Sequence, residues 1–346
     1  MKKYILELHK SAKEALVLLN LNTITQTVCI VNRGGQMVGS LTDGDIRRGL
    51  LKGLKIEEEV SAFMNTNFKF IQKNNYTPAK IKHFIEVEKL KLLPLLDDDK
   101  KIIKFINLHQ KRSLIPAVAI LMAGGKGTRL HPLTISVPKP LLKIDNKPII
   151  EYNIDRLNLY GFESITISVN YLADQIKDCF KDGADKNIEI DYLLEPKELG
   201  TIGSLSLIKD VQTDYLLIMN SDILTNIDFE DFFEFFIHNN ADMVVATIPY
   251  EIKIPYAIMD VEEDEVKGFR EKPTLSYYTN AGIYFIKKSV IELIPDETFF
   301  NATDLMDSVL KEGKKLIHYP IRGYWIDIGQ HEEFKKAQED IKHIIF

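Results

Sequence analysis

Residues 116–140 read Pro-Ala-Val-Ala-Ile-Leu-Met-Ala-Gly-Gly-Lys-Gly-Thr-Arg-Leu-His-Pro-Leu-Thr-Ile-Ser-Val-Pro-Lys-Pro. The stretch begins with a continuous apolar run, 117–122, that contains β-branched residues and ends close to glycine. A short run of this kind is typical of a strand that is buried on both faces of a parallel sheet. We therefore expect the chemistry of the protein at the carboxyl end of this strand.

The glycine-rich turn after the strand is suited to binding a polyphosphate. Gly124, Gly125 and Gly127 have no Cβ, so their backbone N–H groups can approach phosphate oxygens closely. Arg129 offers a planar set of donors, and Lys139 offers a compact charge between two prolines. The spacing matches neither the dinucleotide fingerprint G-x-G-x-x-G nor the P-loop G-x-x-x-x-G-K-[ST]. We therefore expect a triphosphate site of another kind.

Residues 121–140 closely resemble the signature of the sugar-1-phosphate nucleotidyltransferases, L-A-G-G-x-G-T-R-L followed by P-K-P. The resemblance continues through five shorter motifs, in the ranges 195–201, 220–222, 271–273, 280–282 and 325–329. It covers about two thirds of the chain, which is about one family-sized domain. The resemblance implies an α/β fold, with a Rossmann-like, mixed and mainly parallel sheet flanked by helices in the GT-A-like manner.

The resemblance also implies a reaction that joins a nucleoside triphosphate to a sugar 1-phosphate and releases pyrophosphate. The attacking phosphate is charged near neutral pH, so we expect alignment and charge neutralisation rather than a general base. The implied catalytic residues are Arg129, for the leaving pyrophosphate, and Lys139, for the α-phosphoryl group. Asp222 and Asp327 are the implied ligands of Mg²⁺, which prefers carboxylate oxygen. Alternatively, Asp222 caps a helix and Asp327 lies in a turn.

Two further sets of residues follow from the resemblance. The nucleotide-binding set is Ala123, Gly124, Gly125, Gly127, Thr128, Glu195, Glu198, Gly200 and Thr201. The sugar-phosphate-binding set is Asn170, Glu271, Lys272, Asn280 and Gly282.

Different features of the sequence favour a particular base of the nucleotide and a particular sugar. Guanine presents two neighbouring donors, so Glu195 and Glu198 favour GTP, and residues 199–203 resemble the L-G-T-A-G stretch of guanylyltransferases. The combination of this domain with a separate domain that precedes it in the chain resembles the glucosamine-1-phosphate guanylyltransferases. This resemblance favours glucosamine 1-phosphate as the sugar substrate. Mannose 1-phosphate is the main alternative sugar, and uridylyl or thymidylyl transfer is the alternative for the base. A nucleotide-sensing regulator without turnover is an alternative of another class.

Length and composition predict two domains and exclude several partners. The chain has 346 residues and a formal net charge of −6, without a block of Lys and Arg, which argues against nucleic acid as a partner. No apolar run has membrane-spanning length. The two cysteines suit reduced core thiols, and the histidines lack zinc-site spacing. We expect a cytoplasmic homo-oligomer with a regulatory domain over 1–112 and a catalytic domain over 116–346.

Residues 1–112 predict an order of helix, two strands and helix that occurs twice. In the first copy we expect helices over 11–19 and 43–51 and strands over 27–31 and 37–41. In the second copy we expect a helix over 77–88 and strands over 92–96 and 102–106.

This region resembles a tandem pair of CBS motifs, which commonly bind adenine nucleotides. The match is strongest at 38–48, where the resemblance implies that Thr42, Asp43 and Asp45 hold a regulatory AMP or ATP, with Asp45 on the ribose hydroxyls. The second copy lacks the corresponding Thr and Asp. The structural alternative is that Thr42 or Asp43 simply caps a helix.

Overall fold

The computed structural model of the chain describes residues 2–72, 78–109, 111–162, 164–208, 211 and 213–344. The chain divides into two compact units, Met1–Leu114 and Ile115–Phe346. Thr77, at the start of a predicted helix, lies outside the described residues, and so does Gln110. Within the described ranges, no helix is both long and apolar enough to cross a membrane.

The N-terminal unit contains two halves that share the order strand, helix, strand, strand. The first half comprises β1 (Ile5–Glu7), α1 (Ala12–Leu21), β2 (Thr27–Val31), β3 (Met37–Thr42) and α2 (Asp43–Leu51). The second half comprises β4 (Ile71–Gln72), α3 (Pro78–Glu86), β5 (Leu92–Leu96) and β6 (Ile102–Asn107). In each half the first strand pairs in parallel with the second, which pairs antiparallel with the third. In the described part of the second half, no helix corresponds to α2.

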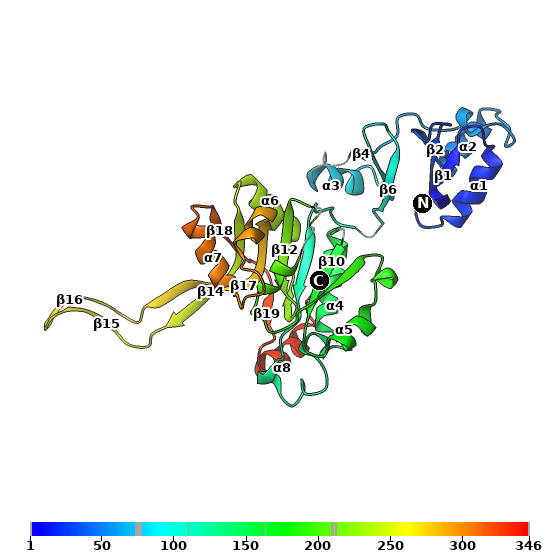
Figure 1. Cartoon of the computed structure of the whole chain (residues 1–346). Helices are drawn as coiled ribbons and strands as arrows, with labels where there is room; N and C mark the ends of the chain where they lie inside the picture. Colours follow the sequence, from blue (N-terminus) through cyan, green and yellow to red (C-terminus); the bar gives the residue numbers. More distant parts are fainter. Residues whose placement is uncertain are drawn as a thin grey trace. The chain divides into compact units, whose positions relative to one another are not determined.

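The C-terminal unit is built on a seven-stranded sheet with the order β11-β10-β7-β12-β17-β14-β18 (Figure 1). The strands are β7 (Val118–Met122), β10 (Ser164–Val169), β11 (Glu189–Leu194), β12 (Tyr215–Asn220), β14 (Met243–Lys253), β17 (Thr274–Lys287) and β18 (Leu316–Pro320). Only β17 runs antiparallel to its neighbours among these strands. The predicted α/β fold with a mixed, mainly parallel sheet is confirmed.

Apolar side chains bury both faces of this sheet. Along β7, Ala119 and Leu121 join one hydrophobic cluster and Ile120 joins the other, because successive side chains of a strand point to opposite faces. One face packs against α4 (Ile149–Leu159), α5 (Ala173–Phe180) and α6 (Phe229–His238), and the other against α7 (Ala302–Lys311). The continuous apolar run of 117–122 is therefore explained by burial on two faces.

Two short strand pairs and one helix complete the body of the unit. They are β8 (Lys143–Ile144) with β9 (Lys147–Pro148), β13 (Ile223–Thr225) with β19 (Trp325–Asp327), and α8 (His331–Asp340).

The prediction that both cysteines are core thiols is confirmed for Cys29, which is buried in β2, and is wrong for Cys179, which is exposed on α5. Both cysteines are free.

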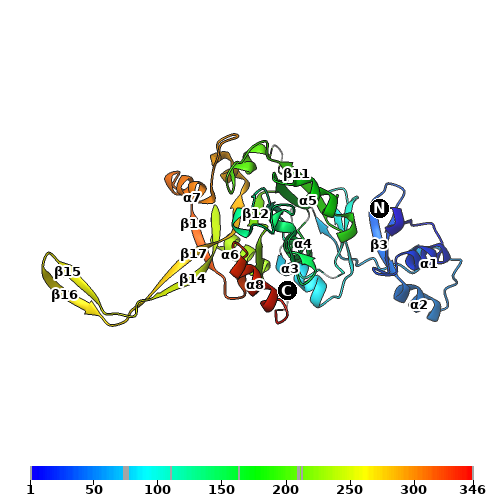
Figure 2. The ribbon, with the colours of Figure 1, turned by 90° about the horizontal axis from the view of Figure 1, so that it is seen from below.

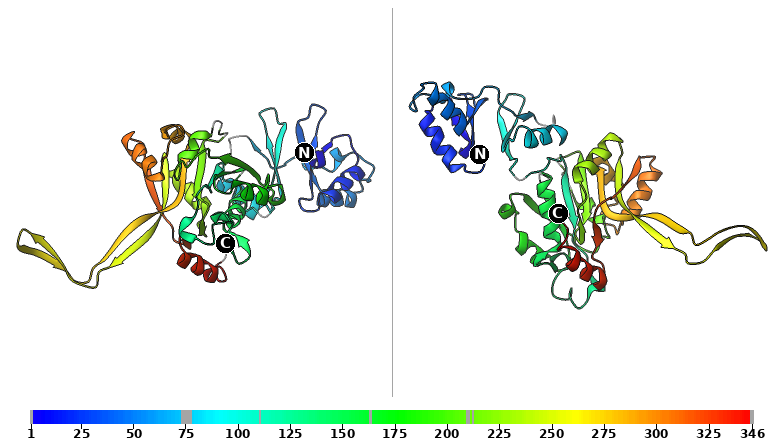
Figure 3. Two further views of the ribbon diagram at one scale, coloured as in Figure 1. Left: turned by 60° about the horizontal axis from the view of Figure 1, so that its bottom comes forward. Right: turned by 180° about the vertical axis from the view of Figure 1, so that it is seen from behind.

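A long two-stranded ribbon leaves the sheet where β14 and β17 continue beyond the core. We call residues 249–278 the arm. Its outer part is the pair β15 (Ile258–Glu262) and β16 (Glu265–Arg270). Seen from below in Figure 2, and from two further sides in Figure 3, the arm projects away from the body of its unit. The sequence did not predict this element.

Candidate active site

The loops at the carboxyl ends of three parallel strands meet at one edge of the sheet. The glycine loop follows β7, Glu195 follows β11, and Asn220 and Ser221 lie at the end of β12. The Ser221 hydroxyl donates a hydrogen bond of 2.6 Å to the carbonyl oxygen of Met122, which ties the β12 and β7 loops together. Crevices at this edge of an open α/β sheet are the usual ligand sites of such folds.

A cavity of about 590 Å³ opens between these loops, within the usual size range for small-molecule sites. Its walls include all nine predicted nucleotide-binding residues: Ala123, Gly124, Gly125, Gly127, Thr128, Glu195, Glu198, Gly200 and Thr201. Arg129, Lys139, Asp222 and Asp327 line the same cavity. The structure thus brings together the predicted nucleotide, catalytic and metal residues.

Lys139 lies between two carboxylates at the floor of this cavity. Its side chain is 11% exposed, and its Nζ forms an ion pair with Asp222 and lies 3.8 Å from Oδ1 of Asp327. Lys139 begins the 3-10 turn Lys139–Leu141, where Pro138 precedes it and Pro140 follows it. The prolines restrict the backbone, so the ammonium group is held in place before any substrate binds.

The pairing of β13 with β19 explains why two carboxylates more than a hundred residues apart become neighbours. Ile223 is directly opposite Asp327 in this antiparallel pair. In addition, the N–H of Ile328 donates a hydrogen bond of 3.1 Å to the carbonyl oxygen of Asp222. The carboxylates are therefore positioned by backbone hydrogen bonds rather than by flexible loops.

The carboxylate pair has two oxygens that could hold a divalent cation. Oδ1 of Asp222 and Oδ1 of Asp327 are buried and accept no hydrogen bond. Burial and the Asp222 carboxylate raise the pKa of Asp327 to about 6, while Lys139 and Arg129 act in the opposite direction. Two unsatisfied carboxylate oxygens suit Mg²⁺, which is commonly held by one or two carboxylates together with substrate phosphates and water. In the described part of the chain, no three His, Cys, Asp or Glu residues gather into a metal-binding group.

Arg129 projects along the same wall as the carboxylate pair. It belongs to the 3-10 turn Thr128–Leu130, which Gly127 precedes in the left-handed conformation with φ 62°. A Cβ at Gly329 would lie 3.5 Å from an Arg129 guanidinium nitrogen, so the guanidinium is close to the segment that contains Asp327. The arginine is exposed and can turn toward an incoming phosphate.

The two glutamates predicted to recognise the base have different surroundings. Glu195 is buried, and its Oε1 accepts a hydrogen bond of 2.6 Å from the Ser168 hydroxyl. Burial raises the pKa of Glu195, and the hydrogen bonds from Ser168 and the Leu199 N–H oppose that rise. Glu198 is exposed and forms an ion pair of 2.5 Å with Lys126. Of the two carboxylates, Glu195 is therefore the one that is held in a fixed position before a nucleotide binds.

A second cavity, of about 260 Å³, adjoins the first, and we call it the sugar-side cavity. It shares Asn220 and Asp327 with the first cavity, which we call the nucleotide cavity after the residues predicted for it, and its walls include the predicted residues Asn280 and Gly282. The Asn280 amide is fixed because it donates a hydrogen bond of 2.8 Å to the Tyr284 hydroxyl and accepts one from the Gly282 N–H.

Three predicted sugar-phosphate residues lie outside both cavities. The Asn170 amide donates a hydrogen bond of 3.0 Å to the carbonyl oxygen of Glu195, so it braces the nucleotide loop instead of facing a sugar. Glu271 and Lys272 belong to the arm, because the long pairing of β14 with β17 carries them away from the body. Of the five predicted sugar-phosphate residues, only Asn280 and Gly282 therefore line a cavity of this site.

Several lining residues received no role from the sequence. Asn220 lies in both cavities, and Asn301 does too, while Trp325 lines the sugar-side cavity and donates a hydrogen bond of 2.9 Å to the Ala281 carbonyl oxygen. Asn301 is recognisable from sequence as the first residue of an Asn-x-x-Asp capping box, which the structure forms with Asp304 at the start of α7. The role of Trp325 has no comparable local pattern.

Comparison with known proteins assigns this unit to a family. A model of the nucleotidyl transferase family matches residues 118–344. The chain belongs to the nucleotidyl transferase family. This confirms the family that the glycine loop and its companion motifs predicted.

Relatives of the nucleotidyl transferase unit include mannose-1-phosphate guanylyltransferases. The catalytic subunit beta of Xenopus tropicalis is 30% identical over 224 residues, covering 62% of this chain and 62% of the relative. The corresponding subunit of Drosophila pseudoobscura is 32% identical over 223 residues, covering 62% of this chain and 60% of the relative. The chain thus spans less than two thirds of the length of these relatives.

Solved structures share the fold of this nucleotidyl transferase unit. A protein described as a glucose-1-phosphate thymidylyltransferase of Bacillus anthracis aligns with a TM-score of 0.55 and 23% identity, over 66% of this chain and 97% of that one. HddC from Yersinia pseudotuberculosis, solved with GMP-PN, aligns with a TM-score of 0.50 and 26% identity, over 65% of this chain and 99% of that one.

Two adjacent glycines of the nucleotidyl transferase loop are expected to respond differently to alanine. A Cβ at Gly124 would lie 2.7 Å from Oε1 of Glu195, whereas a Cβ at Gly125 would meet nothing within 4 Å. We expect Gly124→Ala to destabilise the free protein by about 1–3 kcal/mol, because the buried glutamate must move. Gly125→Ala should leave thermal unfolding unchanged, as differential scanning fluorimetry will measure. An equal melting temperature for both variants would contradict the close packing of Gly124 on Glu195.

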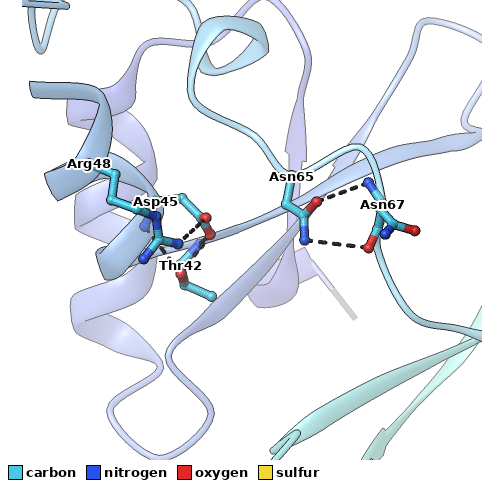
Figure 4. Close-up of polar contacts among 5 residues, drawn as sticks. All are labelled: Thr42, Asp45, Arg48, Asn65 and Asn67. Atoms are coloured by element: carbon cyan, nitrogen blue, oxygen red, sulfur yellow. Dashed lines mark hydrogen bonds and ion pairs between the residues drawn. The ribbon is translucent and has the colours of Figure 1, made fainter. Parts of the chain in front are cut away.

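The N-terminal unit of this nucleotidyl transferase contains its own cavity, of about 540 Å³. Thr42, Asp43 and Asp45 line it, together with Asn65, Asn67 and residues 88–92 of the second half. Figure 4 shows Asp45 bonded to Thr42 and paired with Arg48, and Asn65 bonded to Asn67.

The polar residues at the start of α2 form a capping box. The Asp45 carboxylate accepts hydrogen bonds from the N–H of Thr42, at 2.8 Å, and from its hydroxyl, at 2.6 Å, while its other oxygen lies 2.6 Å from the Arg48 guanidinium. The Thr42 hydroxyl in turn caps the N–H of Asp45. The helix-capping role that the sequence left open is therefore present, and Thr42 and Asp45 both face the cavity while they perform it.

Proposed function

We propose that the protein is a cytoplasmic guanylyltransferase that joins GTP and a hexose 1-phosphate, with release of pyrophosphate. Glucosamine 1-phosphate is the favoured sugar and mannose 1-phosphate the alternative. The observation that carries the proposal is the position of Lys139, which lies between Asp222 and Asp327 beside the glycine loop. Two free cysteines agree with a reducing compartment.

The site supplies positive charge where negative charge gathers. The glycine loop offers backbone N–H groups to the triphosphate, and Arg129 is exposed at the same wall for the pyrophosphate that leaves. Lys139 is fixed in the wall of the nucleotide cavity beside Asp327, where it can neutralise charge that builds on the α-phosphate. Asp222 and Asp327 would hold Mg²⁺, which when bound neutralises phosphate charge.

The environment of Glu195 supports guanine as the base. Its carboxylate is buried at the nucleotide cavity and oriented by Ser168, so it is a fixed acceptor for a base with neighbouring N–H donors. A base without these N–H donors would leave the buried Glu195 carboxylate without a hydrogen-bond partner. The site is therefore expected to reject such a base. The mannose-1-phosphate guanylyltransferases among its relatives and the GMP-PN complex of HddC add support.

A substrate panel tests this proposal. Pyrophosphate release is measured with Mg²⁺ for GTP, UTP, dTTP, CTP and ATP, each with glucosamine 1-phosphate, mannose 1-phosphate and glucose 1-phosphate. We expect the largest kcat/KM with GTP. Preference for UTP or dTTP would replace the guanylyl assignment with uridylyl or thymidylyl transfer. Absence of turnover with every pair, together with tight binding of AMP or ATP, would favour a non-catalytic nucleotide sensor.

We also propose that the N-terminal unit is a CBS pair that binds AMP or ATP and regulates the enzyme. The cavity of about 540 Å³, with Thr42, Asp43 and Asp45 on its wall, supports this second role. Its two halves also share one order of strand, helix and hairpin. The Asp45 carboxylate accepts two hydrogen bonds from Thr42 and one from Arg48, so about one of its four acceptor sites is left for a ribose hydroxyl.

Matched capping-box variants test the regulatory site. The same motif occurs at α1, where Ser11 and Glu14 bond reciprocally outside the cavity. We expect Asp45→Ala to weaken the binding of AMP or ATP at least about tenfold, the effect of roughly one charge-assisted hydrogen bond. Glu14→Ala should cost similar helix stability without affecting binding. Isothermal titration calorimetry that detects no binding by the wild type, or equal binding by both variants, would reject the site.

A further inference from the structure

The arm has an uncovered apolar face on its outer part. Met259 is directly opposite Phe269, and Val261 is opposite Val266, so the four side chains share one face of the β15–β16 pair. They are 53%, 69%, 58% and 59% exposed, respectively. The other face is charged, with Arg270 3.4 Å from Asp260. A two-stranded ribbon is only marginally stable alone in water, so this face is expected to pack against another surface.

The sugar-side cavity lacks the positive charge that a sugar phosphate requires. Among its described lining residues there is no Lys or Arg. The arm, in contrast, carries Glu271 and Lys272, which form no hydrogen bond or ion pair with any described residue. The sugar-side cavity therefore needs a positively charged side chain, and Lys272 of the arm is one that contacts no described residue of opposite charge.

Lys272 cannot reach the sugar-side cavity of its own chain in this conformation. Asn280, in the cavity wall, is separated from Lys272 by the extended segment Thr274–Asn280, which spans roughly 20 Å at the usual rise of a strand. The paired residues from Thr247 with Asn280 to Lys253 with Thr274 hold this segment extended. Folding the arm back over its own cavity would break part of this hydrogen-bonded ladder.

We propose that the arm of one copy docks on a second copy of this chain and places its Glu271 and Lys272 in the second copy's sugar-side cavity. The proposal rests on the proposed function, since it assigns these two residues to the sugar phosphate. A second copy is the occupant because the same chain carries both the incomplete cavity and the missing groups. Two copies related by a two-fold axis then complete one another reciprocally.

An apolar cavity next to the sugar-side cavity suits the apolar face of an incoming arm. It has a volume of about 640 Å³, and it shares Asn280 with the sugar-side cavity. Its walls include Phe235, Val245, Met306 and Leu316. An arriving ribbon would bury its apolar face here while its Glu271 and Lys272 lie at the adjoining polar cavity.

Complementation between two inactive chains tests this arrangement. A Lys139→Ala chain and a Lys272→Ala chain carry different affinity tags, are co-expressed as full chains, and the mixed dimer is purified through both tags. The mixed dimer has one complete site of two if the arm acts on the second copy, so we expect about half of the wild-type activity. The two single-variant dimers should fall well below this value. A mixed dimer as inactive as they are would overturn the proposal and favour an arm that folds back on its own chain.

Sedimentation velocity provides a readout that does not depend on activity. Phe269→Glu should convert a wild-type dimer into a monomer, whereas Leu310→Glu, at an apolar residue of α7 that is similarly exposed, should remain dimeric. A monomeric wild type, or an unchanged dimer for Phe269→Glu, would overturn the docking. If the wild type makes no nucleotide sugar but Phe269→Glu still dissociates, the proposed function fails while the arm interface remains.

Discussion

Replacing Lys139 by alanine is expected to lower kcat on the order of 10²–10³-fold, the usual cost of removing one fixed donor from a developing charge. The ammonium group is nearly buried and is held by the carboxylates and the flanking prolines, so water cannot replace it in the same position. The KM for GTP should change much less, because the glycine loop and Glu195 are intact. Steady-state pyrophosphate release will separate the two parameters.

The same substitution should also make stability more dependent on pH. Lys139 lies beside both Asp222 and Asp327, and its removal leaves the two carboxylates to repel each other. The loss of thermal stability should therefore be larger near about pH 8 than near about pH 5, where Asp327 can take up a proton. Lys143→Ala, at an exposed lysine of β8, is the matched control and should change neither activity nor stability. Activity within about tenfold of the wild type in folded Lys139→Ala would refute the catalytic role.

Asp327→Asn is expected to lower the activity of the enzyme and to raise its thermal stability near neutral pH. Turnover should fall about 100-fold, equivalent to about 3 kcal/mol of transition-state stabilisation, because one of two oxygen donors for Mg²⁺ loses its charge. The variant should also require a higher concentration of Mg²⁺ for half-maximal activity. A titration of Mg²⁺ at saturating substrates measures both effects, and Asp307→Asn, at an exposed residue of α7, is the control.

The stability of Asp327→Asn should differ from that of the wild type in a defined direction. Burial and Asp222 raise the pKa of Asp327 to about 6 in the folded protein, above that of an unfolded aspartate. The folded state therefore holds more protons than the unfolded state between about pH 4 and pH 6, and wild-type stability falls as the pH rises through this window. The variant does not lose this contribution. We expect its melting temperature to exceed that of the wild type near about pH 7.5 and to match it near about pH 4, and the reverse order would contradict the raised pKa.

Local sequence pattern was sufficient to predict the helices and strands whose faces are clearly buried or clearly exposed. The apolar run of 117–122 predicted β7, which begins at Val118, because only a strand buried on both faces needs such continuity. The phenylalanines of 229–236 recur at the spacing of one helical face, and α6 buries four of them. Thr42 caps α2, as the alternative interpretation of the sequence expected for Thr42 or Asp43, since the contacts of a cap lie within one helical turn.

The arm shows where local pattern was insufficient. The sequence motif that contains Glu271 and Lys272 predicted a contact with the sugar phosphate, but not the distance between these residues and Asn280. That distance depends on how far β14 and β17 remain paired after they leave the core. Strand propensity does not determine this extent, because exposed pairs such as Tyr250 with Tyr277 have few neighbours on either face.

The sequence by itself predicted the family and the α/β fold, because its short motifs, beginning with the glycine loop, resemble those of the family, and both predictions are confirmed. The tertiary structure decided that Asp327 lies beside Asp222 through the pairing of β13 with β19, and that Lys139 lies between them. It also decided that the arm leaves its own sugar-side cavity without a cation. These are contacts between distant segments, and they arise from backbone pairing and burial that no local spacing records.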